Sequence, residues 1–264
     1  MNLLRTIADH KLNEVEQQKK LYPIAWLEQT ALFNRTPVSL AKQLLLPDVS
    51  GIIAEFKRQS PSKGIINDSA KVEEVTAGYR RSGASALSIL TDNRFFGGKN
   101  QDLTIARESN DCAILRKDFI VDPYQVIEAK SIGADAILLI AAILTPIEAL
   151  NLATLAKSLG LETILEVHNI DELGHLNDQV SILGVNNRNL SDFTVSLDIS
   201  FSLSKFIPKG ILAISESGIH HPEDIYLLKK AGYKGFLMGE QFMSGINPVI
   251  ACRDFISELR LISQ

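Results

Sequence analysis

An acid and a lysine follow the first strongly apolar run of the chain. Residues 51–62 read GIIAEFKRQSPS, so the run ends in Glu55 and Lys57 before a Ser-Pro turn. In a strand, alternate side chains face opposite sides, so Glu55 and Lys57 would share one face and Phe56 would take the other. Catalytic groups gather at the carboxyl ends of strands in parallel α/β enzymes. The spacing therefore predicts a carboxylate and an amine in one cavity.

Further ionisable residues follow other apolar runs. Lys117 comes after residues 112–116, and Glu166 lies near the end of the run TILEV. Two neighbouring lysines lower each other's pKa, and burial lowers it further, whereas carboxylates raise it, so we expect one lysine to donate a proton near neutral pH. The alternative for both lysines is a salt bridge to a nearby acid. A carboxylate at Glu166 would be costly unless it is paired or functional, and the sequence leaves both open.

The elements that must position these residues have a repeating pattern. From residue 51 onward, continuous apolar runs alternate with helix-like segments, which is typical of parallel strands covered on both faces. Four junctions place basic residues and then a glycine before a strand, as expected where a helix ends. Pro123, Pro146 and Pro222 predict helix starts. The eight predicted strands are residues 51–56, 86–91, 112–116, 134–140, 162–167, 182–186, 212–215 and 235–238.

Eight βα units in 264 residues predict a (β/α)8 TIM barrel, with residues 1–264 forming a single domain. A doubly wound sheet is the alternative, but it calls for a Gly-x-Gly-x-x-Gly turn after the first strand, where this chain has EFKRQSPS. Residues 1–48 carry helical patterns, including 3–20 and 37–46. They predict an N-terminal helical extension that packs against the barrel or folds across its mouth.

The loops after the last two predicted strands suggest an anion site. They read SESGI and MGEQF, and loops at these places bind phosphate in many barrels. We therefore expect a phosphate cradle from Ser217, Gly218 and Gly239, to which Ser60 or Arg58 contributes from the first strand. The alternative is that the glycines only permit tight turns.

Composition excludes several classes of partner. The chain is 45% hydrophobic and 22% charged, with a net charge of -4 and no lysine-arginine block, so we expect a small-molecule ligand and neither nucleic acid nor membrane. The longest apolar run, residues 136–144, is too short to span a bilayer. The two cysteines, Cys112 and Cys252, predict buried reduced thiols and a cytoplasmic location. The histidines lack metal-ligand spacing, so no metal site is expected.

Seven segments resemble motifs of the indole-3-glycerol phosphate synthase family, which are (β/α)8 enzymes of the tryptophan pathway. In chain order they are IIAEFKRQSPSKG, ALSILTDNRFFGG, ILRKDFIVDPYQV, ILEVHN, GVNNRNL, SESGI and GFLMGEQFM. The resemblance spans nearly all of the chain from residue 51. It implies a carboxy-lyase that closes 1-(2-carboxyphenylamino)-1-deoxyribulose 5-phosphate to indole-3-glycerol phosphate, losing carbon dioxide and water, without a cofactor.

Carried onto this chain, the resemblance implies a role for each charged residue. Lys117 resembles the general acid that protonates the substrate carbonyl while the anthranilate ring carbon attacks it. Glu166 resembles a residue that takes part in the later dehydration. Lys57, together with Glu55, would position the substrate carboxylate and transfer protons, and the sequence leaves open which lysine serves the dehydration.

The resemblance also implies which residues contact the substrate. Asn186 and Arg188 resemble a substrate-contacting pair, and Glu216 resembles a further catalytic acid. Glu240 follows the phosphate-site glycine, where a small neutral residue would be expected, so its carboxylate should turn away from the anion. The positions that resemble the phosphate site are Ser60, Ser217, Gly218 and Gly239. The positions that resemble the wall beside the anthranilate ring are Phe96 and residues 138–140.

Two other functions remain as alternatives. A barrel isomerase such as phosphoribosylanthranilate isomerase relies on a cysteine and an aspartate, and Cys112 lies at the wrong end of its strand for that chemistry. A catalytically silent barrel that binds a sugar phosphate should have lost at least one of Lys57, Lys117 and Glu166, and all three are present. As partners we expect a phosphorylated small molecule, a monomer or weak homodimer, and association with other tryptophan-pathway enzymes.

Overall fold

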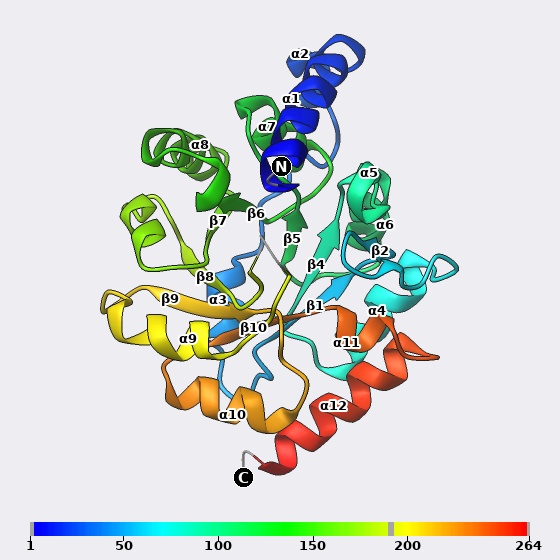
Figure 1. Ribbon diagram of the computed structural model, residues 1–264. Coiled ribbons are helices and arrows are strands. Elements are labelled where there is room, and N and C mark those ends of the chain that lie inside the picture. Colours follow the sequence, from blue (N-terminus) through cyan, green and yellow to red (C-terminus); the bar gives the residue numbers. More distant parts are fainter. Residues whose placement is uncertain (1–2, 190–192, 263–264) are drawn as a thin grey trace.

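Eight parallel strands close into a barrel in the computed structural model, which describes residues 3–189 and 193–262 (Figure 1). The strands are β1 (Ile52–Phe56), β4 (Ala86–Leu90), β5 (Ile114–Lys117), β6 (Ala136–Ile140), β7 (Glu162–Val167), β8 (Ile182–Asn186), β9 (Leu212–Glu216) and β10 (Gly235–Met238). Each pairs in parallel with its neighbours in the chain, and β1 closes the ring by pairing with both β10 and β4. The prediction of a (β/α)8 barrel is confirmed.

Helices surround the strands (Figure 1). The long ones are α4 (Val72–Ser82), α6 (Asn100–Glu108), α7 (Pro123–Ser131), α8 (Pro146–Ser158), α10 (Pro222–Lys230) and α12 (Pro248–Ile262), with the shorter α9 (Asp198–Leu203). Short pieces lie in the loops: α5 (Asn93–Phe96), α11 (Glu240–Met243), η1 (Ala141–Ile143), η3 (Ser204–Phe206) and the hairpin of β2 (Gln59–Ser60) and β3 (Gly64–Ile65). Between β7 and β8 the chain forms only the 3-10 helix η2 (Asp171–His175).

Local sequence signals set where these helices begin and end. The Asp122 and Thr145 side chains accept hydrogen bonds from N–H groups of the first turns of α7 and α8, each of which starts with proline. The four predicted helix-ending glycines, Gly83, Gly133, Gly160 and Gly232, all have the left-handed backbone, with φ between 76° and 107°.

All predicted strand limits agree with the structure to within two residues. The strand predicted for residues 134–140 begins at Ala136, because the N–H of Ala134 instead donates to Ala129 in the turn that closes α7. The strand predicted for residues 112–116 is displaced to Ile114–Lys117, so Lys117 belongs to the strand itself. The helix predicted for residues 37–46 is limited to α3 (Leu40–Leu44), since Ser39 caps its start.

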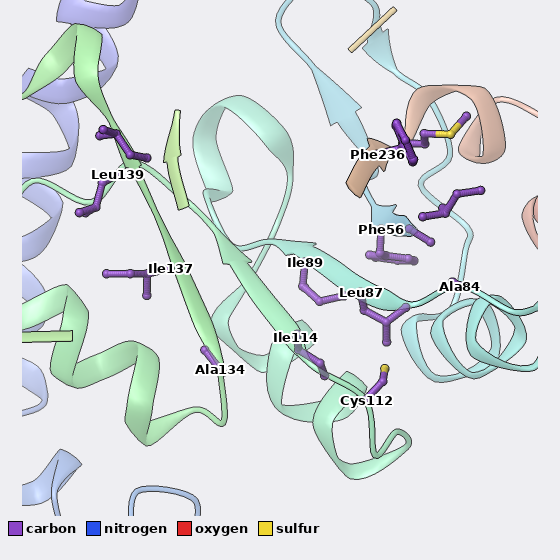
Figure 2. Close-up of a cluster of buried hydrophobic side chains, with 14 of the residues drawn as sticks. Phe56, Ala84, Leu87, Ile89, Cys112, Ile114, Ala134, Ile137, Leu139 and Phe236 are labelled. Atoms are coloured by element: carbon purple, nitrogen blue, oxygen red, sulfur yellow. The ribbon is translucent and has the colours of Figure 1, made fainter. Parts of the chain in front are cut away.

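Side chains alternate between two apolar layers. In β1, Ile52 and Phe56 point outward and join the large cluster between strands and helices, part of which appears in Figure 2. Ile53 points inward and joins Leu115, Ile164 and equivalent residues of other strands in the barrel interior. Glu55 is therefore inward-facing, as the alternation predicted. The interior is a packed apolar core, and the cluster of charged side chains that includes Glu55 lies beyond it at the carboxyl ends of the strands.

The N-terminal extension comprises α1 (Leu3–Leu21), α2 (Ile24–Leu27) and α3, and it covers both ends of the barrel. Leu4 and Ile7 of α1 join the inner cluster from the carboxyl end, where α1 also packs against α7 (Figure 1). Leu40 and Leu44 of α3 join the same cluster from the opposite end. Both predicted placements of the extension are therefore realised, by different helices.

A buried aspartate ties this extension to the barrel. Asp135, at the start of β6, is fully buried. Its carboxylate accepts hydrogen bonds from the guanidinium groups of Arg35 and Arg107 and from the N–H groups of Val38 and Ile114. Arg35 and Val38 belong to the extension, so one carboxylate joins the extension, α6 and β5.

We expect Asp135→Ala to lower the free energy of unfolding by about 3–5 kcal/mol, because the substitution leaves Arg107 buried without its counter-charge. Urea denaturation followed by circular dichroism measures this loss. The exposed Asp178, changed to alanine in the same way, is the control and should change stability by less than about 0.5 kcal/mol. A loss below 1 kcal/mol for Asp135→Ala would contradict the anchoring role.

Candidate active site

The predicted site residues meet at the carboxyl end of the barrel. Two adjoining pockets lie there, and they share a wall that includes Glu55, Lys57, Arg188 and Ser217. The predicted residues in the first pocket are Glu55, Lys57, Ser60, Phe96, Lys117, Glu166, Asn186, Arg188, Glu216 and Ser217. Gly218 and Gly239 line the second pocket. The structure thus brings together residues from seven of the barrel's βα loops and strand ends.

Glu55 and Lys57 form an ion pair at the end of β1. Lys57 Nζ lies 3.0 Å from Glu55 Oε1, and both side chains are largely buried. Gly239 makes room for this pair, because a Cβ atom at that position would lie only 2.7 Å from Glu55 Oε1. Glycine at 239 is therefore required by the close approach of the Glu55 carboxylate.

Lys117 lies between two buried carboxylates from other strands. Its Nζ atom is 3.5 Å from Glu166 Oε2 and 3.6 Å from Glu216 Oε2. Burial lowers the pKa of Lys117, but the charges of Glu166, Glu216 and Glu55 outweigh burial and raise the pKa above the ordinary lysine value. The expected lowering by a second lysine is therefore wrong for Lys117, because carboxylates dominate its surroundings. At neutral pH it is a fully protonated ammonium.

The two carboxylates beside Lys117 have opposite acid strengths. Burial alone would raise the pKa of Glu166, but Lys117, His168 and Asn186 lower it to about 2. Burial raises the pKa of Glu216 to about 8, and the charges of Glu166 and Glu55 add to this effect against that of Lys117. Neither Glu216 carboxylate oxygen has a hydrogen-bond partner among the described residues. Near neutral pH, Glu166 is therefore ionised and Glu216 is protonated. Such a difference between neighbouring carboxyl groups is typical of acid–base sites.

An apolar wall faces these charges. Phe96 and Phe119, after β4 and β5, have ring centroids 5.9 Å apart, and Leu138 and Ile140 of β6 continue the wall. Of the wall positions that the resemblance implied, Phe96, Leu138 and Ile140 line this pocket, whereas Leu139 points outward into the cluster between strands and helices. Leu3, Leu4 and Ile7 of α1 also line this pocket. Sequence reasoning did not assign these three to the site, although their helical spacing marked one apolar face.

The loop after β9, which was expected to bind an anion, turns tightly at the edge of the second pocket. Ser217 and Gly218 both have the left-handed backbone, with φ of 66° and 75°, and the Asn187 side chain donates to the Ser217 carbonyl at 3.0 Å. Ser60 also reaches the cavity from the first strand. Arg58 does not, so the alternative contribution expected from it is wrong. Its guanidinium turns outward and pairs with Asp102 of α6 at 2.5 Å.

Glu240 differs from the expectation. Its carboxylate does not turn away from the cavity but lines both pockets. It lies 3.3 Å from Arg188 Nη2 and 3.5 Å from Lys63 Nζ. Two cations at the rim hold the carboxylate in place, which is the physical reason that the expectation is wrong.

Two charged residues next to the site were not assigned to it from the sequence. His168 Nε2 lies 3.3 Å from Glu166 Oε1, and the signal for this contact was the same two-residue spacing that paired Glu55 with Lys57. Lys11 of α1 is only 1% exposed, and its Nζ atom lies 2.8 Å from Asp92 and 3.0 Å from Asp118.

The two partners of Lys11 lie where strand-end residues are expected, because Asp92 follows β4 and Asp118 follows β5. The signal for Lys11 was its place on the apolar face of α1, between Ile7 and Val15. Among the described residues, no group of three or more histidine, cysteine or acidic side chains could hold a metal ion. None of the helices described is both long and apolar enough to cross a membrane.

Comparison with known proteins gives the family. A family model described as indole-3-glycerol phosphate synthase matches residues 4–255. The chain belongs to the indole-3-glycerol phosphate synthase family. It is 44% identical over 260 residues to the indole-3-glycerol phosphate synthase of Bacteroides thetaiotaomicron, covering 98% of this chain and 99% of that relative. The indole-3-glycerol phosphate synthase of Carboxydothermus hydrogenoformans is 38% identical, with 93% and 96% covered.

Solved structures agree with the fold. KGPDC from Streptococcus mutans superposes with a TM-score of 0.61 at 14% sequence identity, covering 81% of this chain and 98% of that one. Such a likeness concerns the barrel alone. The predicted indole-3-glycerol phosphate synthase family is confirmed by the sequence relatives, and the protein is thus an enzyme of tryptophan synthesis.

The raised pKa of Glu216 predicts an unusual pH dependence of stability. An unfolded glutamate has a pKa of about 4.3, so between that pH and about 8 the folded protein keeps a proton that the unfolded chain has lost. Stability therefore falls as pH rises through this range. Since each pKa unit corresponds to about 1.4 kcal/mol, we expect Glu216→Gln to gain at least about 2 kcal/mol relative to the wild type between pH 5 and pH 8.5.

Denaturant unfolding of both proteins at several pH values measures this difference. Glu223→Gln, an exposed substitution on α10, is the matched control and should track the wild type at every pH. A difference between Glu216→Gln and the wild type that stays constant with pH would show that Glu216 ionises normally in the folded protein.

Proposed function

We propose that this enzyme closes the indole ring of 1-(2-carboxyphenylamino)-1-deoxyribulose 5-phosphate, releasing carbon dioxide and water and forming indole-3-glycerol phosphate. The class is that of a carboxy-lyase without a cofactor. One observation carries the proposal: the Lys117 ammonium lies 3.5 Å from Glu166 and 3.6 Å from Glu216, in a cavity that both Phe96 and Ser217 also line. Family membership gives independent support.

The two ends of the cavity suit the two ends of this substrate. The anthranilate ring fits against Phe96, Phe119 and the α1 side chains, whereas the phosphate fits the loop of Ser217 and Gly218 together with Gly239. The reacting carbonyl then lies between them, near Lys117. Ring closure develops positive charge on the ring and an oxygen leaving group, so it needs an anion near the ring and a proton donor at the carbonyl.

In the first step we assign Lys117 as the general acid. The ring carbon attacks the carbonyl carbon, a carbon–carbon bond forms, and the carbonyl oxygen takes a proton from the Lys117 ammonium. The bond to the carboxylate then breaks, and its electron pair returns to the ring as carbon dioxide leaves. Glu216, itself protonated near neutral pH, lies within reach of Lys117 and is our candidate for returning the proton.

In the later dehydration, the hydroxyl accepts a proton from the ammonium group of Lys57 or Lys117 and leaves as water, while a carboxylate removes a proton from the ring. We assign Glu166 to this stage, because it is ionised and lies on the same side of the cavity as Lys117. Lys57, with Glu55, would hold the substrate carboxylate at the start of the reaction. Asn186 and Arg188 are our candidates for further substrate contacts, since both line the cavity.

The alternative functions have less support. An isomerase that uses a cysteine would need Cys112 in the cavity, but this residue is fully buried at the amino end of β5. A silent sugar-phosphate-binding barrel does not explain why Lys57, Lys117 and Glu166 share one cavity.

Organisation and location complete the proposal. We infer that residues 1–264 act as one domain with residues 1–48 as its extension, and that the protein works as a monomer or weak homodimer in the cytoplasm, associating with other tryptophan-pathway enzymes. The inner apolar cluster that α1 and α3 share with the strands supports the first inference. The two buried free thiols support a reducing compartment.

Lys117→Met tests the assigned acid. General acid–base catalysis contributes about 10²–10⁴-fold, so we expect kcat to fall by about that factor, while the melting temperature and KM change little. The assay supplies the carboxyphenylamino substrate and follows indole fluorescence. Lys205→Met, an exposed substitution, is the control and should keep wild-type turnover. Full turnover by Lys117→Met would refute the acid role, and a wild-type protein without turnover would refute the proposed function.

A further inference from the structure

A chain of charged groups runs from the cavity to the surface beside β7. Glu166 Oε1 lies 3.3 Å from His168 Nε2, and His168 Nδ1 lies 3.1 Å from Glu172 Oε2. The imidazole is thus placed between two carboxylates, with each ring nitrogen facing one of them. His168 is absent from the lining of both pockets, so the ring stands behind Glu166 and does not face the substrate.

The short η2 helix makes this chain possible. The 3-10 helix η2 begins four residues after the end of β7, and this places Glu172 within hydrogen-bond distance of the His168 backbone. There its carboxylate accepts hydrogen bonds from the His168 N–H and the Asn169 side-chain amide, each at 2.8 Å, and the Glu172 N–H donates to Asn169 Oδ1. The position of Glu172 is therefore fixed by backbone and side-chain contacts, so it can hold the imidazole in one orientation.

The surroundings keep the imidazole charged. The ionisable groups that face it are Glu166 of β7, Glu172 of η2 and, more distantly, Glu216 of β9, while Lys117 of β5 is the cation on the far side of Glu166. Burial lowers the pKa of His168, but Glu166 and Glu172 outweigh burial and raise it to about 10. Both ring nitrogens then carry protons: Nδ1 is hydrogen-bonded to Glu172, whereas Nε2 faces Glu166 as an ion pair outside hydrogen-bond geometry.

We propose that His168 is a positioning residue: held as a cation by Glu172, it fixes the carboxylate of Glu166 beside Lys117 and keeps that carboxylate ionised. The inference rests on the proposed function, in which Glu166 takes part in the dehydration. Lys117 alone does not settle the state of Glu166, because the same ammonium is shared with Glu216. His168 is a second cation that contacts Glu166 and not Glu216, so it favours Glu166 as the ionised carboxylate of the two.

Glu172→Gln is the decisive variant, because it removes the charge that holds the imidazolium while leaving every cavity-lining residue in place. We expect the pKa of His168 to fall toward its ordinary value of about 6.5. At pH 6 the variant should turn over like the wild type, because His168 is still charged. Charge-assisted hydrogen bonds contribute about 1.5–3 kcal/mol, so at pH 8.5 we expect kcat to be about 10–100-fold lower, with KM little changed.

Two measurements separate this role from a structural one. The imidazole proton shifts of His168, followed by NMR across pH 5–10, report its pKa directly and require no turnover. The kcat–pH profile should show a new alkaline limb in Glu172→Gln at the pKa that NMR finds. Asp171→Asn is the matched control, since it removes the same charge from the same 3-10 helix at an exposed position, and it should behave like the wild type.

His168→Gln completes the experiment. It should lower kcat at every pH, and adding Glu172→Gln should cause no further loss, because the two residues act through one contact. An unchanged His168 pKa in Glu172→Gln, or a kcat–pH profile parallel to that of the wild type, would overturn the inference. If the wild type itself fails to form the indole product, the proposed function and the catalytic part of this inference fail, whereas the NMR titration still decides whether Glu172 holds His168 charged.

Discussion

The cost of burying charge governs this protein. Glu55, Glu166 and Glu216 are each at most 4% exposed at the end of an otherwise apolar barrel, where isolated carboxylates would be unstable. Lys57 and Lys117 bring the compensating cations, and each lies between 3.0 and 3.6 Å from its acids. Glu216 is the carboxylate that retains a proton near neutral pH, because burial raises its pKa to about 8 and it shares Lys117 with Glu166. The arrangement of buried charges thus gives the site a carboxyl group that can donate a proton.

The barrel makes this cluster possible because it separates two kinds of inward position. Lower inward positions carry apolar residues such as Ile53 and Ile164, and the next inward positions on the same strands carry Glu55 and Glu166. Glycine on a neighbouring strand provides space for the acids. A Cβ atom on Gly184 would lie 2.5 Å from a Glu216 oxygen, so the carboxylate occupies volume that any larger residue would fill.

The extension covers part of the open carboxyl end of the barrel. Its helix α1 brings Leu4 and Ile7 over the apolar half of the pocket, and the buried Lys11 fixes that helix to Asp92 and Asp118. Asp118 directly follows Lys117, so the contact that fixes the cover also restrains the strand end that carries the ammonium. Enclosure strengthens every electrostatic interaction inside the cavity, because it replaces water by fixed protein groups.

Local sequence determined the elements of this protein, whereas tertiary contacts decided its electrostatics. Continuous apolar runs, helix-starting prolines and helix-ending glycines act on neighbouring residues, so strands, helix limits and the shared face of Glu55 and Lys57 could be predicted from the chain alone. The outward turn of Arg58, the placement of Glu240 between two cations and the raised pKa of Lys117 could not. Each depends on charges that come from distant segments, and only the closed barrel sets the distances between them.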